Sequence, residues 1–270
     1  YNVDKAFDRF VSRTQQKRRT VFNIPKIVYG AAAVILLLIA STISYWWGER
    51  QLQNQFADIL VEAPLGAKTK LILPDSTLVW LNAGSKIVYS QGFGVKDRHL
   101  RLNGEAYFEV ARNEKCPFVV RTHAMDIEVL GTKFNVEAYS KKAVFEASLM
   151  QGKIRVKSPH NEKTAVVLLP NYKTTLKDGR LVVRKIDDYN VYRWKEGLYC
   201  FKSKPFTQIM EDLERYYDLK IQVDKKSIES VALTGKFRIS DGLDYALRVL
   251  QKDVSFTYRR DKDNDVIYIK

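Results

Sequence analysis

The stretch Ile27–Trp47, IVYGAAAVILLLIASTISYWW, contains no charged residue, and it is preceded by Lys26 and followed by Glu49 and Arg50. With a rise of 1.5 Å per residue, a helix of this length crosses the ~30 Å hydrocarbon layer of a bilayer. A helix satisfies its backbone polar groups internally, as the bilayer interior requires. The sequence therefore predicts a transmembrane helix over residues 26–48.

The flanks of this stretch predict its orientation. Cations gather before it at Lys17–Arg19, whereas Arg50 is the only cation close behind it, so the N-terminus is expected in the cytoplasm. A cleaved secretory signal is the alternative, but its apolar core would span only ~7–15 residues and end in small side chains. We therefore favour an uncleaved anchor that contacts membrane lipid. Its expected interfacial residues are Lys26, Tyr45, Trp46 and Trp47.

Composition excludes several function classes. The formal net charge is +14, but the cations are scattered and most follow the span, so direct nucleic-acid binding is not expected. His99, His123 and His160 show no metal-ligand spacing, and no nucleotide-binding or hydrolase motif occurs, so neither a metal nor a cofactor is expected. Cys116 and Cys200 are expected to be two isolated buried thiols rather than a bridge.

Residues 1–25 form the expected cytoplasmic segment. Val3, Phe7, Phe10 and Val11 recur at helical spacing, with charged residues on the other faces. One amphipathic helix of this length is not stable alone in water, so its apolar face requires a partner or lipid headgroups. The residues by themselves leave both alternatives open.

Residues 51–186 contain many short alternating segments separated by turn residues, which is typical of an all-β, two-layer fold. Asn103-Gly104 separates His99–Leu102 from Glu105–Val110, and this pair predicts a tight hairpin. No helix is expected to interrupt this domain.

After Asp187 the pattern changes. A linker over residues 187–197 is expected to lead into a small α+β domain, residues 198–270, in the order β-α-β, β-α-β-β. Asp241 is expected to cap the second helix, and a hairpin around Asp261–Asp265 closes the chain. The final strand, including Val266, Ile267, Tyr268 and Ile269, is a candidate for edge pairing with another domain.

Several motifs resemble a known family. Leu73–Ala83, Leu102–Val110, Pro117–Val120 and Val129–Tyr139 resemble the periplasmic FecR domain of transmembrane anti-sigma factors, in the family's order. The segments GLYCFKSKPFTQIMEDLERYYDLKI and LDYALRVL resemble the domain that follows FecR in Bacteroidetes-type members. That domain is similar to the signalling (STN) domain of secretins and TonB-dependent receptors.

This resemblance implies a regulatory function. Family members hold an extracytoplasmic-function (ECF) sigma factor at the inner membrane, and their periplasmic part contacts the signalling domain of an outer-membrane TonB-dependent receptor. DKAFDRFVSR resembles only the last part of the family's sigma-binding region, so we expect the sequence to be truncated at its start. That expectation favours Val3, Phe7, Phe10 and Val11 as sigma-binding residues. The alternative function is a membrane-anchored periplasmic binding or scaffold protein without a sigma partner.

Gly131-Thr132 carries the only chemistry that the resemblance suggests. Some relatives cleave themselves at the matching bond, where a Thr hydroxyl attacks the preceding carbonyl. A glycine bulge between two strands is the favoured alternative. Apart from this possible single turnover, no enzyme activity is expected.

Overall fold

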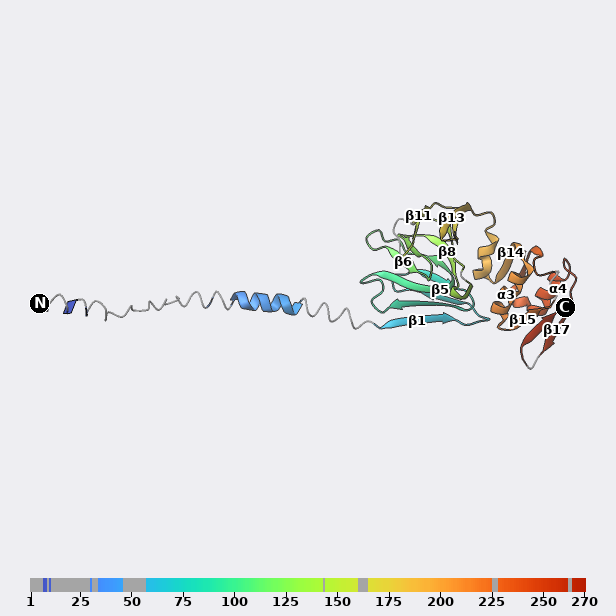
Figure 1. Ribbon diagram of the computed structural model, residues 1–270, viewed down its shortest axis with the longest axis horizontal. Helices are drawn as coiled ribbons and strands as arrows, with labels where there is room; N and C mark the ends of the chain where they lie inside the picture. The colour runs from blue at the N-terminus through green and yellow to red at the C-terminus, as the bar shows by residue number, and fades with distance from the viewer. Residues whose placement is uncertain are drawn as a thin grey trace. The chain divides into compact units, whose positions relative to one another are not determined.

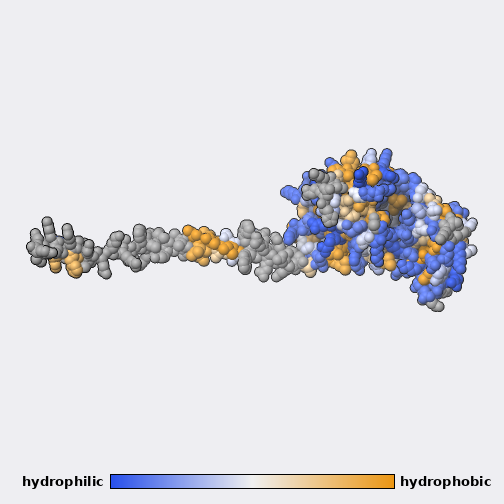
Figure 2. Space-filling view, viewed as in Figure 1, coloured by the Kyte–Doolittle hydropathy of each residue, from blue (hydrophilic) through white to orange (hydrophobic). Residues whose placement is uncertain are grey.

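The computed structural model describes residues 7, 8, 10, 30, 34–45, 57–142, 144–159, 165–224, 228–261 and 264–270. The chain divides into two compact units, Tyr1–Gln55 and Phe56–Lys270. In the first unit, residues 34–45 are helical, and Figure 2 shows them as a hydrophobic stretch. Among the described residues, no helix is both long enough and apolar enough to pass through a membrane.

The second unit begins with a β domain, residues 58–185, whose described residues form 13 strands. Its strands lie in two layers that share the long strand β5 (Arg98–Glu109) (Figure 1). Layer 1 contains β1 (Asp58–Ala63), β4 (Ser85–Ser90), β6 (Phe118–Arg121), β7 (Asp126–Val129), β10 (Ile154–Lys157) and β11 (Ala165–Leu168). Layer 2 contains β2 (Thr69–Ile72), β3 (Leu78–Leu81), β8 (Lys133–Ala138), β9 (Glu146–Gln151), β12 (Tyr172–Lys177) and β13 (Arg180–Lys185). The expected two-layer β architecture is therefore present.

The core of the β domain lies between these layers. Alternate residues of each strand point inward, as the period of two requires. Phe108 of β5 stacks on Phe134 of β8 with ring centroids 4.9 Å apart, and it meets Phe118 of β6 edge-on at 5.9 Å. All three side chains are fully buried, so these aromatic contacts tie layer 2 to layer 1.

The hairpin predicted at Asn103-Gly104 is wrong, because both residues lie inside β5. Residues 98–103 of β5 pair with β4 and β6, whereas residues 104–109 pair with β3 and β8. Gly104 has φ 122°, and a Cβ there would lie 2.6 Å from the Cα of Ser85. The glycine therefore allows β5 to pass from one layer to the other in close contact with β4.

The predicted linker is a packed element. Residues Asn190–Glu196 form the 3₁₀ helix η2, and Trp194 within it is only 2% exposed. The Trp194 Nε1–H donates to Asn135 Oδ1 of β8 at 3.3 Å, and Lys68 Nζ donates to the Trp194 carbonyl at 2.9 Å. Residues 187–197 therefore lie against the outer face of layer 2.

The C-terminal domain, residues 198–270, has the expected element order. It consists of β14 (Leu198–Pro205), α3 (Phe206–Tyr217), β15 (Lys220–Val223), β16 (Ala232–Arg238), α4 (Leu243–Leu250), β17 (Tyr258–Asp261) and β18 (Val266–Ile269). β14 pairs with β16, and the other three strands form a second sheet in the order β15-β18-β17. The apolar faces of α3 and α4 share a core with both sheets.

Two smaller expectations for this unit need correction. Asp241 does not cap α4: Gly242 occupies the N-cap, and no side chain bonds there. Cys116 and Cys200 are free thiols as expected, but only Cys200 is buried, because Cys116 remains partly exposed.

Candidate functional site

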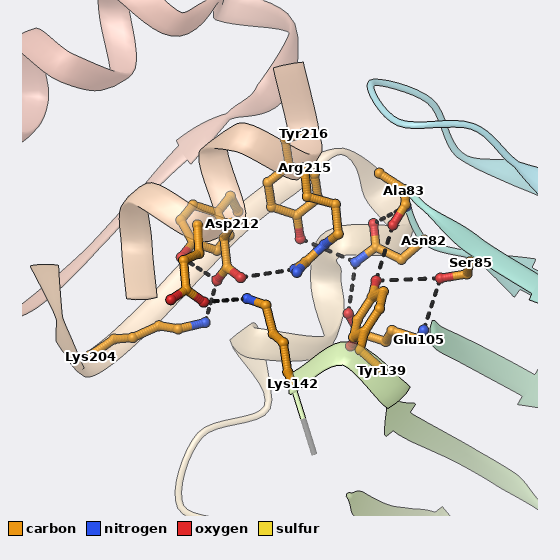
Figure 3. Close-up of polar contacts among 12 residues, drawn as sticks. Asn82, Ala83, Ser85, Glu105, Tyr139, Lys142, Lys204, Asp212, Arg215 and Tyr216 are labelled. Carbon is orange, nitrogen blue, oxygen red and sulfur yellow. Dashed lines mark hydrogen bonds and ion pairs between the residues drawn. The ribbon is translucent and has the colours of Figure 1, made fainter. Parts of the chain in front are cut away.

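A buried polar cluster joins the β domain to the C-terminal domain. It forms where the outer face of layer 2 meets α3 and β14 (Figure 3). Odd-numbered residues in the second half of β5 face this side, because the even-numbered ones fill the core. Glu105 therefore points toward the C-terminal domain and is only 9% exposed.

Two amides hold the Glu105 carboxylate. Asn82 Nδ2 donates to its Oε2 at 2.7 Å, and Asn135 Nδ2 donates to its Oε1 at 3.0 Å. Ser85 Oγ accepts the Glu105 backbone N–H at 2.8 Å. Burial raises the pKa of Glu105, although these amide bonds and the nearby Arg215 guanidinium oppose the increase.

On the facing side, α3 contributes an ion pair that is almost completely buried. Arg215 Nη2 donates to Asp212 Oδ1 at 2.9 Å, and both residues lie on one face of the helix at i, i+3. Tyr199 of β14 donates its hydroxyl to Asp212 Oδ2 at 2.7 Å, and Lys204 also binds this oxygen. Burial alone would raise the pKa of Asp212, but the Lys204 and Arg215 cations hold it below its usual value.

Contacts cross directly between the domains. The Arg215 guanidinium lies 4.6 Å from the ring centroid of Tyr139, whose hydroxyl donates to the Ala83 carbonyl at 3.1 Å. Asn82 Nδ2 also donates to the Tyr216 hydroxyl at 3.2 Å, and the Gly66 N–H donates to the Arg215 carbonyl at 2.9 Å. We call this set of residues the joint: Gly66, Asn82, Ser85, Glu105, Asn135, Tyr139, Tyr199, Lys204, Asp212, Arg215 and Tyr216.

Glu137 gives the joint a titratable neighbour. It pairs across the strands with Glu105, so the two carboxyl groups point to the same face of layer 2. Burial, followed by the Glu105 and Asp212 charges, raises the pKa of Glu137 to about 7, while Lys204 and Arg215 oppose the increase. The joint therefore holds several mutually dependent charges at the contact between two domains.

A groove of about 670 Å³ runs beside the joint. The end of β1, the start of β4, the turn that follows β8 and the last turns of α3 line it, together with the loop before β18. Cations and carboxylates both line the groove, including the Lys142–Glu211 ion pair that crosses between the domains. Among the described residues, no group of three or more His, Cys, Asp and Glu side chains could hold a metal ion.

The predicted cytoplasmic and membrane-contact residues are described only in part. Phe7 and Phe10 lie in helical residues and are 66% and 65% exposed. Tyr45 is the last described residue of the helical stretch and is exposed. The remaining candidates lie outside the described residues: Val3, Val11, Lys26, Trp46 and Trp47.

Gly131 and Thr132 lie between β7 and β8, at the edge of a shallow pocket of about 370 Å³. The Thr132 side chain is buried, and its hydroxyl donates to the Lys153 carbonyl at 3.2 Å. A Cβ on Gly131 would lie 2.8 Å from the Arg112 Cα, so close packing is what requires glycine here. Self-cleavage of this bond stays a prediction.

The final strand is not an edge. β18 lies between β15 and β17, which corrects the prediction that Val266, Ile267, Tyr268 and Ile269 offer an open edge. The error has a physical reason: β18 pairs in parallel with β15, which lies over 40 residues earlier, and no local pattern reveals such a contact. Ile267 and Ile269 are buried in the core of the C-terminal domain.

The joint itself was missed by sequence reasoning. Asp212 and Arg215 lie on α3 among the apolar residues Ile209, Leu213 and Tyr216, and a polar pair on a buried helix face is the signal that could have revealed it. Glu105 lies in a motif that was interpreted as an ordinary strand.

Comparisons with known proteins agree on one family. The profile of the FecR protein family matches residues 60–155, and that of the FecR C-terminal domain matches residues 198–269. Two crystal structures of a candidate anti-sigma factor from Parabacteroides distasonis ATCC 8503 are similar to this chain, each with 30% identity and a TM-score of 0.70. The matches cover 78% and 79% of this chain and 98% of the crystallised one. No curated protein sequence matches. The chain belongs to the FecR family of anti-sigma factors.

Proposed function

We propose that this protein is a single-pass inner-membrane anti-sigma factor that relays a signal across the periplasm. In this proposal residues 1–25 bind an ECF sigma factor in the cytoplasm, and residues 26–48 cross the membrane. The unit Phe56–Lys270 then lies in the periplasm and contacts the signalling domain of an outer-membrane TonB-dependent receptor.

The observation that carries the proposal is the combination of a FecR-family unit with an apolar helical stretch on the same chain. Leu36 and Leu37 within residues 34–45 are 66% and 71% exposed, and their neighbours are similarly uncovered. Exposed apolar area costs about 25 cal/mol per Å² in water, so such a surface is favourable only when lipid or protein covers it. Lipid is the covering that the uncharged stretch from Ile27 to Trp47 fits.

The sigma-binding part of the proposal rests on Phe7 and Phe10. Both are large apolar residues on a helical segment, and both are exposed. An amphipathic helix that offers aromatic anchors at i and i+3 suits a groove on a partner protein. The family membership supports a sigma factor as that partner.

The test is a pull-down of cellular sigma factors with the detergent-solubilised full chain. We expect wild-type protein to retain an ECF sigma factor, and Phe7→Asp or Phe10→Asp to release it. Asp8→Asn is the matched control, because Asp8 lies in the same helical segment and is exposed. Retention of no sigma factor, with a receptor signalling domain still bound, would instead establish the periplasmic binding protein.

A further inference from the structure

The three-stranded sheet of the C-terminal domain has two outer strands, β15 and β17, and they differ in their free backbone groups. β18 lies between them, parallel to β15 and antiparallel to β17. An outer strand with unpaired N–H and C=O groups is a template for a strand of another protein. The outer edges of β15 and β17 can therefore be compared bond by bond.

The outer edge of β15 is occupied in its middle by the chain itself. Asp224 N–H donates to the Ile269 carbonyl of β18 at 2.9 Å, so even-numbered residues of β15 face β18. Ile221 then faces outward, and its N–H donates to Glu214 Oε1 of α3 at 2.7 Å. The α3 side chain occupies the position that an incoming strand would need.

The outer edge of β17 is open. Thr257 and Lys270 exchange both backbone hydrogen bonds, at 2.8 and 2.9 Å, which fixes the phase of the antiparallel ladder. Because such pairs recur at every second residue, Arg259 faces β18, and the backbone groups of Tyr258 and Arg260 point away from the sheet. Among the residues that the structure describes, none accepts the N–H of Tyr258 or Arg260.

Two arginines lie next to each other on this edge, where the strand ends in Asp261 and Arg260 lies 3.7 Å from Asp265. Arg259 and Arg260 are both exposed, and the surface over the C-terminal domain is largely hydrophilic (Figure 2). The Arg259 guanidinium lies 5.4 Å from the Tyr268 ring centroid, where the ring keeps it beside the strand. A strand added to β17 would place its own side chains next to the Arg259 guanidinium and next to the Arg260–Asp265 pair, and a carboxylate would be favoured beside Arg259.

We propose that β17 is the docking edge of the C-terminal domain and that it accepts an acidic strand from the receptor's signalling domain. This inference rests on the proposed function, which supplies the receptor as the partner. Within the described strand, the outward backbone groups are those of Tyr258 and Arg260. At roughly 1 kcal/mol net per hydrogen bond, the contact is weak and reversible, as a signal relay requires.

Arg260→Pro tests the backbone contact. Proline removes the outward N–H and places its ring in the path of an incoming strand, whereas the ladder with β18 loses no bond at this position. We expect at least a tenfold weaker affinity for the signalling domains of the cell's TonB-dependent receptors, measured by titration calorimetry, with an unchanged Tm. Arg260→Glu should weaken binding as well, and Lys236→Glu, which reverses an exposed charge on β16, should not.

Hydrogen exchange gives a second measurement that does not depend on a variant. In the wild-type chain, the amides of Tyr258 and Arg260 should exchange more slowly once the signalling domain binds. The Arg259 amide faces β18 already and should stay unchanged, so it serves as an internal control.

The outcomes separate this inference from the proposed function. Equal binding by wild type and Arg260→Pro, without new protection at Tyr258, would overturn the docking edge and leave the receptor relay intact. No binding by the wild-type chain to any receptor signalling domain would overturn both. A wild-type dimer that Arg260→Pro converts to a monomer would assign the edge to a second copy of this chain and also overturn the inference.

Discussion

Replacing Arg215 with methionine should weaken the contact between the two domains at the joint. The substitution keeps the length of the aliphatic stem but removes the cation from a position only 8% exposed. Removing one partner of a buried ion pair costs about 3–5 kcal/mol, because the other charge stays buried. Asp212 keeps Lys204 and the Tyr199 hydroxyl, so the loss from the ion pair alone is below that range, at about 2 kcal/mol. Loss of the contact with Tyr139 adds roughly 1 kcal/mol. We therefore expect Arg215→Met to cost about 3 kcal/mol.

The assay is denaturant unfolding of a fragment that contains the unit Phe56–Lys270. Unfolding is followed by the fluorescence of Trp80 in β3 and Trp194 in η2, which both lie at the outer face of layer 2. At about 2–4 °C per kcal/mol for a chain of this size, Tm should fall by roughly 6–12 °C. Lys142→Met is the matched control: it breaks an exposed ion pair across the same contact and should cost less than about 1 kcal/mol.

A double variant separates buried charge from lost packing. In Arg215→Met combined with Asp212→Asn, no uncompensated carboxylate remains, so the double variant should be more stable than Arg215→Met alone. If Arg215→Met unfolds within 1 kcal/mol of wild type, or if the double variant is no more stable than the single one, the ion pair does not hold the joint together.

Three further predictions concern the β domain. Burial raises the pKa of Glu137 to about 7, so the folded protein keeps the carboxyl proton up to a higher pH than the unfolded chain does. The free energy of unfolding should therefore fall as pH rises from about 4.5 to 7. Glu137→Gln should reduce that fall, by up to about 3 kcal/mol in urea titrations at the two pH values, and an unchanged slope would exclude Glu137 as its source. Gly104→Ala should prevent folding or cost over about 3 kcal/mol, because at φ 122° the added Cβ would overlap Ser85. Gly179→Ala is the control, because Gly179 has φ 73° and open space around it. If both variants lowered Tm equally, the overlap with Ser85 would not be the cause. Arg98→Met should cost about 4 kcal/mol by the same assay, because the buried guanidinium binds Asp75 and three backbone carbonyls, whereas Arg101→Met on the surface should cost under about 1 kcal/mol.

Most of the β domain's strands and the order of the C-terminal elements could be predicted because their apolar periodicity is local. β12 carries no such signal, because YKTTLK is polar and its one fully buried residue, Thr174, gives no apolar alternation. Asn103-Gly104 was misinterpreted for the opposite reason. Its local turn signal is strong, yet the glycine serves a strand that changes layers, and tertiary pairing overrides the local preference.

The contact between the two halves of the joint could not be predicted from periodicity. Glu105 and Arg215 are 110 positions apart in the sequence. The polar pair on the apolar face of α3 is a local signal, but no local pattern indicates that Glu105 lies opposite it. Their burial follows only once η2 and the C-terminal domain cover the outer face of layer 2. The order of β15, β18 and β17 has the same non-local character, which is why an edge was expected at β18.

Helix α3 connects the proposed docking sheet to the joint within one turn. Glu214 binds the backbone of β15, while the next residue, Arg215, binds Asp212 and packs on Tyr139 of the β domain. The sheet and α3 also share an apolar core, whose contacts are dense and non-directional, so the C-terminal domain should move as one body. The joint, in contrast, depends on directional bonds such as Asn82 to Tyr216 at 3.2 Å, and these fail with a small change of angle. Binding at β17 should therefore move the C-terminal domain as one body. The structural change is then expected at the joint, where the polar contacts between the two domains can be exchanged.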